Sequence, residues 1–118
     1  MNNPAYEIHC RYSLESRSAA AGIPLRTSIE QLQMERWYMT AVIPYHDYVV
    51  LSWKIGMYTE GDCSAAVYHF DSDDHTIEGP LTLVYLYYRE FDDLGDATKT
   101  ALSRAECLKA DELMKERK

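Results

Sequence analysis

The chain has 118 residues, of which 47% are hydrophobic, and its formal net charge is −7. At this length we predict a single domain, residues 1–118, because two separate cores would each approach the size at which burial barely offsets chain entropy. The acidic balance disfavours a general nucleic-acid binder, since such proteins neutralise phosphates with clustered Lys and Arg.

The N-terminal quarter is predicted to be an arm, residues 1–27, attached to a compact core, residues 28–118. Gly22 and Pro24 interrupt any regular element within the arm. A helix is predicted over residues 28–43, because Ser28 can accept a hydrogen bond from the amide of Gln31 in a capping box and Pro44 ends the apolar run.

The next two apolar runs, residues 45–58 and 81–90, fit either a helix or a strand. Val49, Leu51 and Trp53 alternate with their neighbours, which is typical of a strand. At an offset of 34 residues, however, VVLSWKIGMYTEGDCSAAV lies over LVYLYYREFDDLGDATKTA, and each run is followed by Gly-Asp. Repetition near this period is typical of stacked helical pairs.

We therefore predict a mainly α fold, a small single-domain helical protein, and keep one alternative. The alternative is an α+β fold in which three strands, residues 48–58, 65–70 and 81–90, form an antiparallel meander. Two helices, residues 28–43 and 97–116, would then pack on one face of that sheet.

The C-terminal segment shows two apolar stripes when projected as a helix. Ala97, Ala101, Ala105 and Leu108 form the first, which Glu112 interrupts. Cys107, Ala110 and Met114 form the second, rotated by well over a right angle. One straight helix would have difficulty burying both, whereas a turn near residues 101–103 would let two short helices face one core, as in a helix-turn-helix.

The run LVYLYYREFDDLGDATKTALSRAECLKADELM resembles the helix-turn-helix of sigma-factor region 4 and of phage antitermination regulators. The positions that carry the resemblance are Ala97, Leu102, Ser103, Arg104 and Cys107. Ala101 stands where the family's motif usually has glycine, which leaves a continuous helix open as the alternative. The resemblance implies a recognition helix whose DNA-contacting residues would be Ser103, Arg104 and Lys109.

Direct DNA contact is opposed by the distribution of charge. Residues 1–98 hold six Lys or Arg against fifteen Asp or Glu, whereas residues 99–118 hold six against four. Only the C-terminal tail could approach a phosphate comfortably, and the acidic remainder would repel it at long range.

No catalytic or cofactor motif is evident. The histidines at positions 9, 46, 69 and 75 share no ligand-like spacing, and structural roles are expected even where His46 and Asp47, or Cys63 and His69, meet in space. A phosphate-binding Gly-rich loop and a nucleophile elbow are both missing from the sequence. We therefore predict a protein that is not an enzyme and that uses no cofactor or metal.

Location is predicted from the cysteines and from hydropathy. Three widely separated cysteines imply neither a disulfide framework nor a zinc finger, which favours a reducing cytoplasm. No window of the sequence approaches the apolar run needed to span a membrane.

The function expected from these features is that of a small bacterial or phage regulator of transcription. It would act by protein–protein binding, as an anti-activator or adaptor on a transcription factor or polymerase component, and a homodimer is reasonable. The candidate contact residues are Tyr45, Tyr48, Trp53, Tyr85, Tyr87, Tyr88 and Arg89. The alternatives are a helix-turn-helix DNA-binding regulator, or an inhibitor of a nucleic-acid enzyme that uses acidic residues 71–74 and 90–93 to imitate phosphates.

Overall fold

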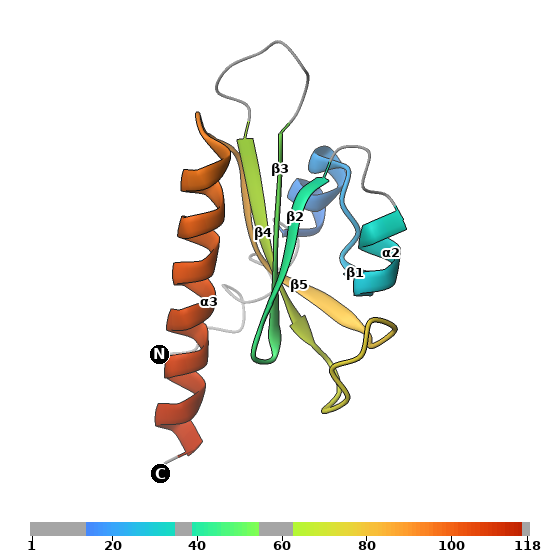
Figure 1. Cartoon of the computed structure of the whole chain (residues 1–118), viewed down its shortest axis with the longest axis vertical. Coiled ribbons are helices and arrows are strands. Elements are labelled where there is room, and N and C mark those ends of the chain that lie inside the picture. Colours follow the sequence, from blue (N-terminus) through green and yellow to red (C-terminus); the bar gives the residue numbers. More distant parts are fainter. Residues whose placement is uncertain (1–13, 35–38, 55–62, 117–118) are drawn as a thin grey trace.

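The protein has three layers, with a five-stranded antiparallel sheet between a long C-terminal helix and the N-terminal segments (Figure 1). The computed structural model describes residues 14–34, 39–54 and 63–116. The elements are β1 (Arg26–Thr27), α2 (Ile29–Met34), β2 (Met39–Tyr45), β3 (Tyr48–Lys54), β4 (Cys63–Phe70), β5 (Leu81–Phe91) and α3 (Leu94–Glu116). Residues 14–21 are also helical. The strand order is β1-β5-β4-β3-β2.

The mainly α prediction is wrong, because the chain forms an α+β fold whose centre is the antiparallel meander β3-β4-β5. The period-two alternation was the correct signal. It places Val49, Leu51 and Trp53 in the core on one face of the sheet and Val50 in the core on the other. The α+β alternative placed both helices on one face of the sheet. In the structure α3 covers one face and α2 covers the other, so the central strands are apolar on both sides.

The predicted helix over residues 28–43 is correct only at its start. Gln31 N donates to Ser28 Oγ at 3.2 Å, as a capping Ser requires. The described helix α2 ends at Met34, and β2 then pairs with β3, placing Val42 opposite Leu51. β-Branched residues favour this pleated, half-buried setting over a helix.

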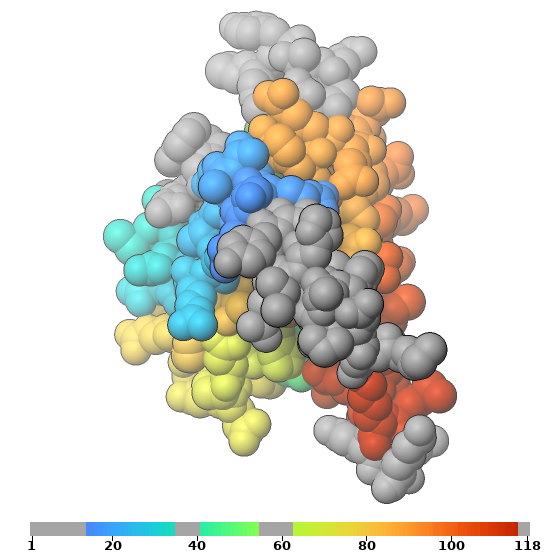
Figure 2. Space-filling model, turned by 180° about the vertical axis from the view of Figure 1, so that it is seen from behind, coloured from blue at the N-terminus to red at the C-terminus, as the bar shows by residue number. Residues whose placement is uncertain are grey.

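The described part of the predicted arm belongs to the core. Ile23 is 4% exposed, and Leu25 packs against the same cluster. The Leu25 carbonyl accepts from Leu83 N at 2.8 Å, and the Pro24 carbonyl accepts from Tyr68 Oη at 2.6 Å. Figure 2, which views the molecule from behind, shows the N-terminal segment against β5. Arg17 Nη2 of this segment donates to the carbonyl of Leu86 in the middle of the strand.

Helix α3 is continuous, so the turn expected near residues 101–103 is absent and the helix-turn-helix prediction is wrong. Ala97, Ala101 and Ala105 are fully buried on the sheet, and their small side chains allow the helix to approach it closely. The second apolar stripe is not buried at all: Cys107 and Ala110 are exposed and Met114 is 69% exposed. The expected conflict between the two stripes therefore does not arise.

The internal repeat has no structural counterpart in the described residues. Residues 63–67 lie in strand β4, whereas residues 97–101, which align with them at the offset of 34, lie in α3. Asp93 caps the start of α3, since Asp93 Oδ2 accepts from Asp96 N at 3.3 Å. None of the described helices is both long enough and apolar enough to cross a membrane.

Candidate functional site

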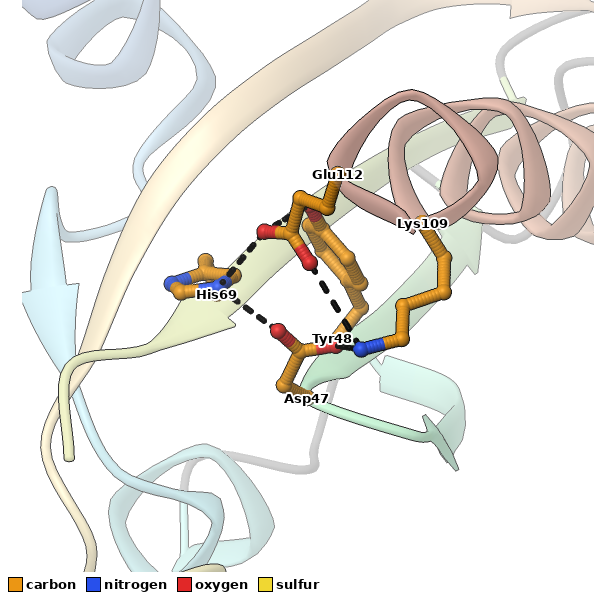
Figure 3. A network of polar contacts seen from close by, with 5 residues as sticks. All are labelled: Asp47, Tyr48, His69, Lys109 and Glu112. Atoms are coloured by element: carbon orange, nitrogen blue, oxygen red, sulfur yellow. Dashed lines mark hydrogen bonds and ion pairs between the residues drawn. The ribbon is translucent and has the colours of Figure 1, made fainter. Parts of the chain in front are cut away.

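Five polar side chains meet where the β2–β3 turn, the end of β4 and the last turns of α3 come together (Figure 3). We call Asp47, Tyr48, His69, Lys109 and Glu112 the ionic cluster. Tyr45 pairs with Tyr48, which leaves His46 and Asp47 as the two residues of a tight hairpin turn, and His46 has the positive φ of 54° that such turns need. Tyr48 in turn pairs with His69 across β3 and β4.

Two carboxylates share one histidine and one lysine in the ionic cluster. His69 Nε2 lies 3.0 Å from Asp47 Oδ2 and 3.3 Å from Glu112 Oε1. Lys109 Nζ lies 3.2 Å from Asp47 Oδ1 and 3.6 Å from Glu112 Oε2. Tyr48 Oη donates to Glu112 Oε1 at 2.9 Å, which fixes the carboxylate from the core side.

The protonation states follow from these contacts. Burial alone would raise the pKa of Asp47, but the contacts with Lys109 and His69 outweigh it and hold that pKa below its ordinary 3.8. Burial, and next the Glu112 carboxylate, raise the pKa of Tyr48, so its phenol stays protonated. Asp47 Oδ1 is buried and accepts no hydrogen bond of good geometry, although Lys109 Nζ is near enough for an ion pair.

An open hollow of about 680 Å³ lies over the ionic cluster. Its lining is rich in titratable groups, namely His46, Asp47, His69, Asp73, His75, Lys109, Glu112 and Lys115. The ring of His75 stacks on Phe70 at 4.5 Å between centroids, so a histidine outside the cluster is also held at the rim. A hollow of this composition suits a small polar ligand or a cation.

A second site lies on the sheet face beside α3, and we call Tyr85, Tyr87, Phe91 and Arg104 the tyrosine–arginine patch. Arg104 Nε donates to Tyr87 Oη at 3.1 Å, and its guanidinium carbon lies 4.3 Å from the centroid of the Tyr85 ring. The two tyrosine rings are 4.8 Å apart. The hydrogen bond to Tyr87 is the main reason that the pKa of Arg104 lies above its ordinary value, so the patch carries a fixed positive charge.

A strained bulge adjoins this patch on β5. Five residues of β5, from Tyr87 to Phe91, span the pairing positions that three residues cover on β4, from Cys63 to Ala65. Arg89 in this bulge has a φ of 56°, which is costly for a residue with a side chain. Ser64, fully buried, holds the conformation by accepting from Arg89 N at 2.8 Å.

The predicted contact residues have different fates. Trp53 and Tyr48 are core residues, 1% and 4% exposed, so neither offers a surface to a partner. Tyr45 and Tyr88 are half-buried and pack against opposite core clusters. Tyr85 and Tyr87 come together in the tyrosine–arginine patch, and Arg89 is exposed on the bulge.

The predicted DNA-contacting residues are mostly engaged within the protein. Ser103 is exposed, but Arg104 is held by the two tyrosines and Lys109 by the two carboxylates. A phosphate would have to displace these contacts. The arrangement therefore removes the cations that the recognition-helix interpretation requires.

The ionic cluster was not predicted. Structural roles were expected for the histidines, and the pairs considered were His46 with Asp47 and Cys63 with His69, without Glu112. Two signals were present. Glu112 interrupts an apolar helix stripe, and His46-Asp47 lies between two apolar runs, where a tight turn would project the carboxylate at the end of the sheet.

Residues 23–105 match the model of a protein family described as nucleotide modification associated domain 4. The matched segment contains the whole tyrosine–arginine patch, whereas Lys109 and Glu112 of the ionic cluster lie beyond it. No curated protein and no solved structure matches the chain.

Proposed function

We propose that this chain, which belongs to the nucleotide modification associated domain 4 family, is a non-catalytic component of a nucleotide-modification system that docks on another protein. The docking site is the tyrosine–arginine patch. The partner is a protein that itself handles nucleic acid, such as a modification enzyme or a transcription regulator, and presents a basic rim. Neither Cys63 nor Cys107 is in a disulfide, which supports a reducing cytoplasm as the location.

The preorganisation of the tyrosine–arginine patch carries this proposal. Tyr and Arg dominate the binding energy of protein interfaces. Here Tyr85 and Tyr87 are half-buried and in mutual contact, and both hydroxyls accept from Arg104. Much of the side-chain entropy that docking would otherwise cost is therefore already lost in the free protein.

The charge of the surrounding surface indicates what kind of partner fits. Glu90, Asp92 and Asp93 are exposed where β5 leads into α3, close to the tyrosine–arginine patch. Glu90 is also the ion-pair partner of Arg17 at 3.6 Å. Acidic residues beside one end of the patch complement a basic protein surface, whereas a phosphate backbone would be repelled by them.

The absence of turnover is part of the proposal. Tyr48 is held protonated by its buried surroundings, and His69 is held by two carboxylates rather than beside a nucleophile. Cys63 is 1% exposed and so is closed to a substrate. Among the described residues, these contacts support a binding role better than nucleophilic catalysis.

The test is capture of a partner from the native host, followed by affinity measurement with the purified partner. Arg104→Ala and Tyr87→Ala should each weaken binding at least tenfold at moderate salt, while Lys99→Ala, which removes an exposed cation from the same helix, should leave it unchanged. Equal binding by all four proteins would refute the proposed site. Binding to naked duplex DNA that Arg104→Ala abolishes would replace docking with a DNA-binding function.

A further inference from the structure

We propose that Asp47, His69 and Glu112 form a binding site for a first-row divalent metal ion, with Zn²⁺ and Mn²⁺ as its probes. This site is separate from the tyrosine–arginine patch and goes beyond the docking function. One carboxylate oxygen from each acid and one imidazole nitrogen can be chosen so that all three lie within 4.8 Å of one another.

The distances around His69 already fit a shared ion. Nε2 is 3.0 Å from Asp47 Oδ2 and 3.3 Å from Glu112 Oε1. Two ligands bound at about 2.1 Å from one metal stand about 3.0 to 3.4 Å apart for bond angles between square and tetrahedral. The chosen oxygens of Asp47 and Glu112 lie within 4.8 Å of each other, and a dication between them would draw the two carboxylates together.

The three ligands are held by different parts of the fold, which preorganises the site. Asp47 is fixed in the tight β2–β3 turn, and His69 sits near the end of β4 opposite Tyr48. The Tyr48 hydroxyl, on a 4% exposed residue, donates to Glu112 Oε1. A buried donor that orients a ligating carboxylate is the usual outer support of a metal site.

Lys109 occupies the position of a weak resident counter-ion. Its ammonium reaches both carboxylates, at 3.2 Å and 3.6 Å, yet Asp47 Oδ1 is buried without a well-angled hydrogen bond. A dication placed between the two carboxylates would interact with both more strongly than one shared ammonium does. Metal binding requires Nε2 of His69 to carry no proton, with the ring proton on Nδ1, and Lys109 would turn toward the hollow.

The donor set selects the class of metal. One imidazole nitrogen and two carboxylate oxygens suit Zn²⁺ or Mn²⁺, whereas Mg²⁺ prefers oxygen ligands and retains its waters. Three protein ligands leave at least one coordination position open. That position faces the hollow of about 680 Å³, where an oxygen of water or of an anionic ligand would complete the shell.

The experiment is calorimetric titration of the full-length protein with ZnCl₂, with Mn²⁺ binding followed in parallel by electron paramagnetic resonance. The exposed thiol of Cys107 is a competing zinc ligand, so all proteins carry Cys107→Ser. We expect one saturable site per chain. His69→Gln and Glu112→Gln should each weaken it at least tenfold, and Tyr48→Phe about tenfold through the lost outer contact.

Two further variants make the result decisive. His75→Gln removes a histidine that lines the same hollow but lies outside the proposed ligands, and it should leave affinity unchanged. Lys109→Met removes the competing cation and should tighten metal binding severalfold. Glu112 is about one-third exposed on α3, so Glu112→Gln remains informative if His69→Gln fails to fold.

Absence of a saturable site, or equal affinities in Glu112→Gln, His75→Gln and the parent protein, would overturn the proposal. Equal loss in His75→Gln and Glu112→Gln would also overturn it, since it would mean diffuse binding over the hollow. Partner capture through the tyrosine–arginine patch is unaffected by Glu112→Gln in either case, which keeps this test independent of the docking proposal.

Discussion

Replacing Ala101 by leucine tests whether α3 lies on the sheet as one continuous helix. Ala97, Ala101 and Ala105 are all 0% exposed, and their cluster includes Val67 and Ala65 of β4. An isobutyl group at Ala101 has no space there, and such overpacking costs roughly 1 to 3 kcal/mol. For a domain of this size that corresponds to a fall in Tm of roughly 5 to 15 °C.

The matched control is Ala110→Leu, which adds the same atoms to the exposed side of the same helix. It should change the free energy of unfolding by no more than about 0.5 kcal/mol. Urea titrations monitored by circular dichroism compare the two variants directly. If Ala101→Leu proved as stable as Ala110→Leu, the helix would not be packed on the sheet.

Replacing Ala101 by glycine distinguishes a continuous helix from a helix-turn-helix. Ala101→Gly would be tolerated in a turn but destabilises a continuous helix by about 1 kcal/mol.

Three further outcomes are expected. Ser64→Ala removes the acceptor for Arg89 N and should cost about 1 to 3 kcal/mol in urea titration, whereas the exposed Ser103→Ala should be nearly neutral. Asp47 has a lowered pKa, so its contribution to stability is present above 3.8 and is lost as the pH falls through its folded value. The difference in unfolding free energy between the parent and Asp47→Asn, measured by urea titration, should therefore shrink as the pH falls from 3.8 through the folded pKa of Asp47. Gly79→Ala would place a Cβ 2.8 Å from the Asp74 carbonyl oxygen and should lower Tm, as measured by calorimetry.

The local patterns in the sequence predicted more of the fold than the global fold class did. Alternation at Val49, Leu51 and Trp53 predicted β3, and the capping box at Ser28 predicted the start of α2. The predicted fold class was wrong because the apparent repeat at an offset of 34 residues was given more weight than the alternation of apolar residues. Strands buried on both faces read as continuous apolar runs, which periodicity alone does not separate from buried helices.

The sites were harder to predict because they depend on contacts distant in sequence. Arg104 and Tyr87 are 17 residues apart, and Tyr48 and Glu112 are 64 apart. That Tyr85 and Tyr87 contact a partner stays a prediction, and the structure shows that Arg104 bonds to both hydroxyls. Trp53 is also an aromatic residue in an apolar run, so the sequence alone did not distinguish it from the two tyrosines. In the structure the N-terminal segments cover its side of the sheet.

The two halves of helix α3 contribute to different sites. Its first half is fixed by the buried alanines and presents Arg104 to the tyrosines of β5, all within the segment that matches the family. Its last turns extend past that segment and supply Lys109 and Glu112 to a turn and a strand end. A lysine committed to two carboxylates and an arginine committed to two tyrosines are unavailable to phosphates. Arg104 and Lys109, which suggested DNA recognition, are therefore engaged within the protein, in the tyrosine–arginine patch and in the ionic cluster.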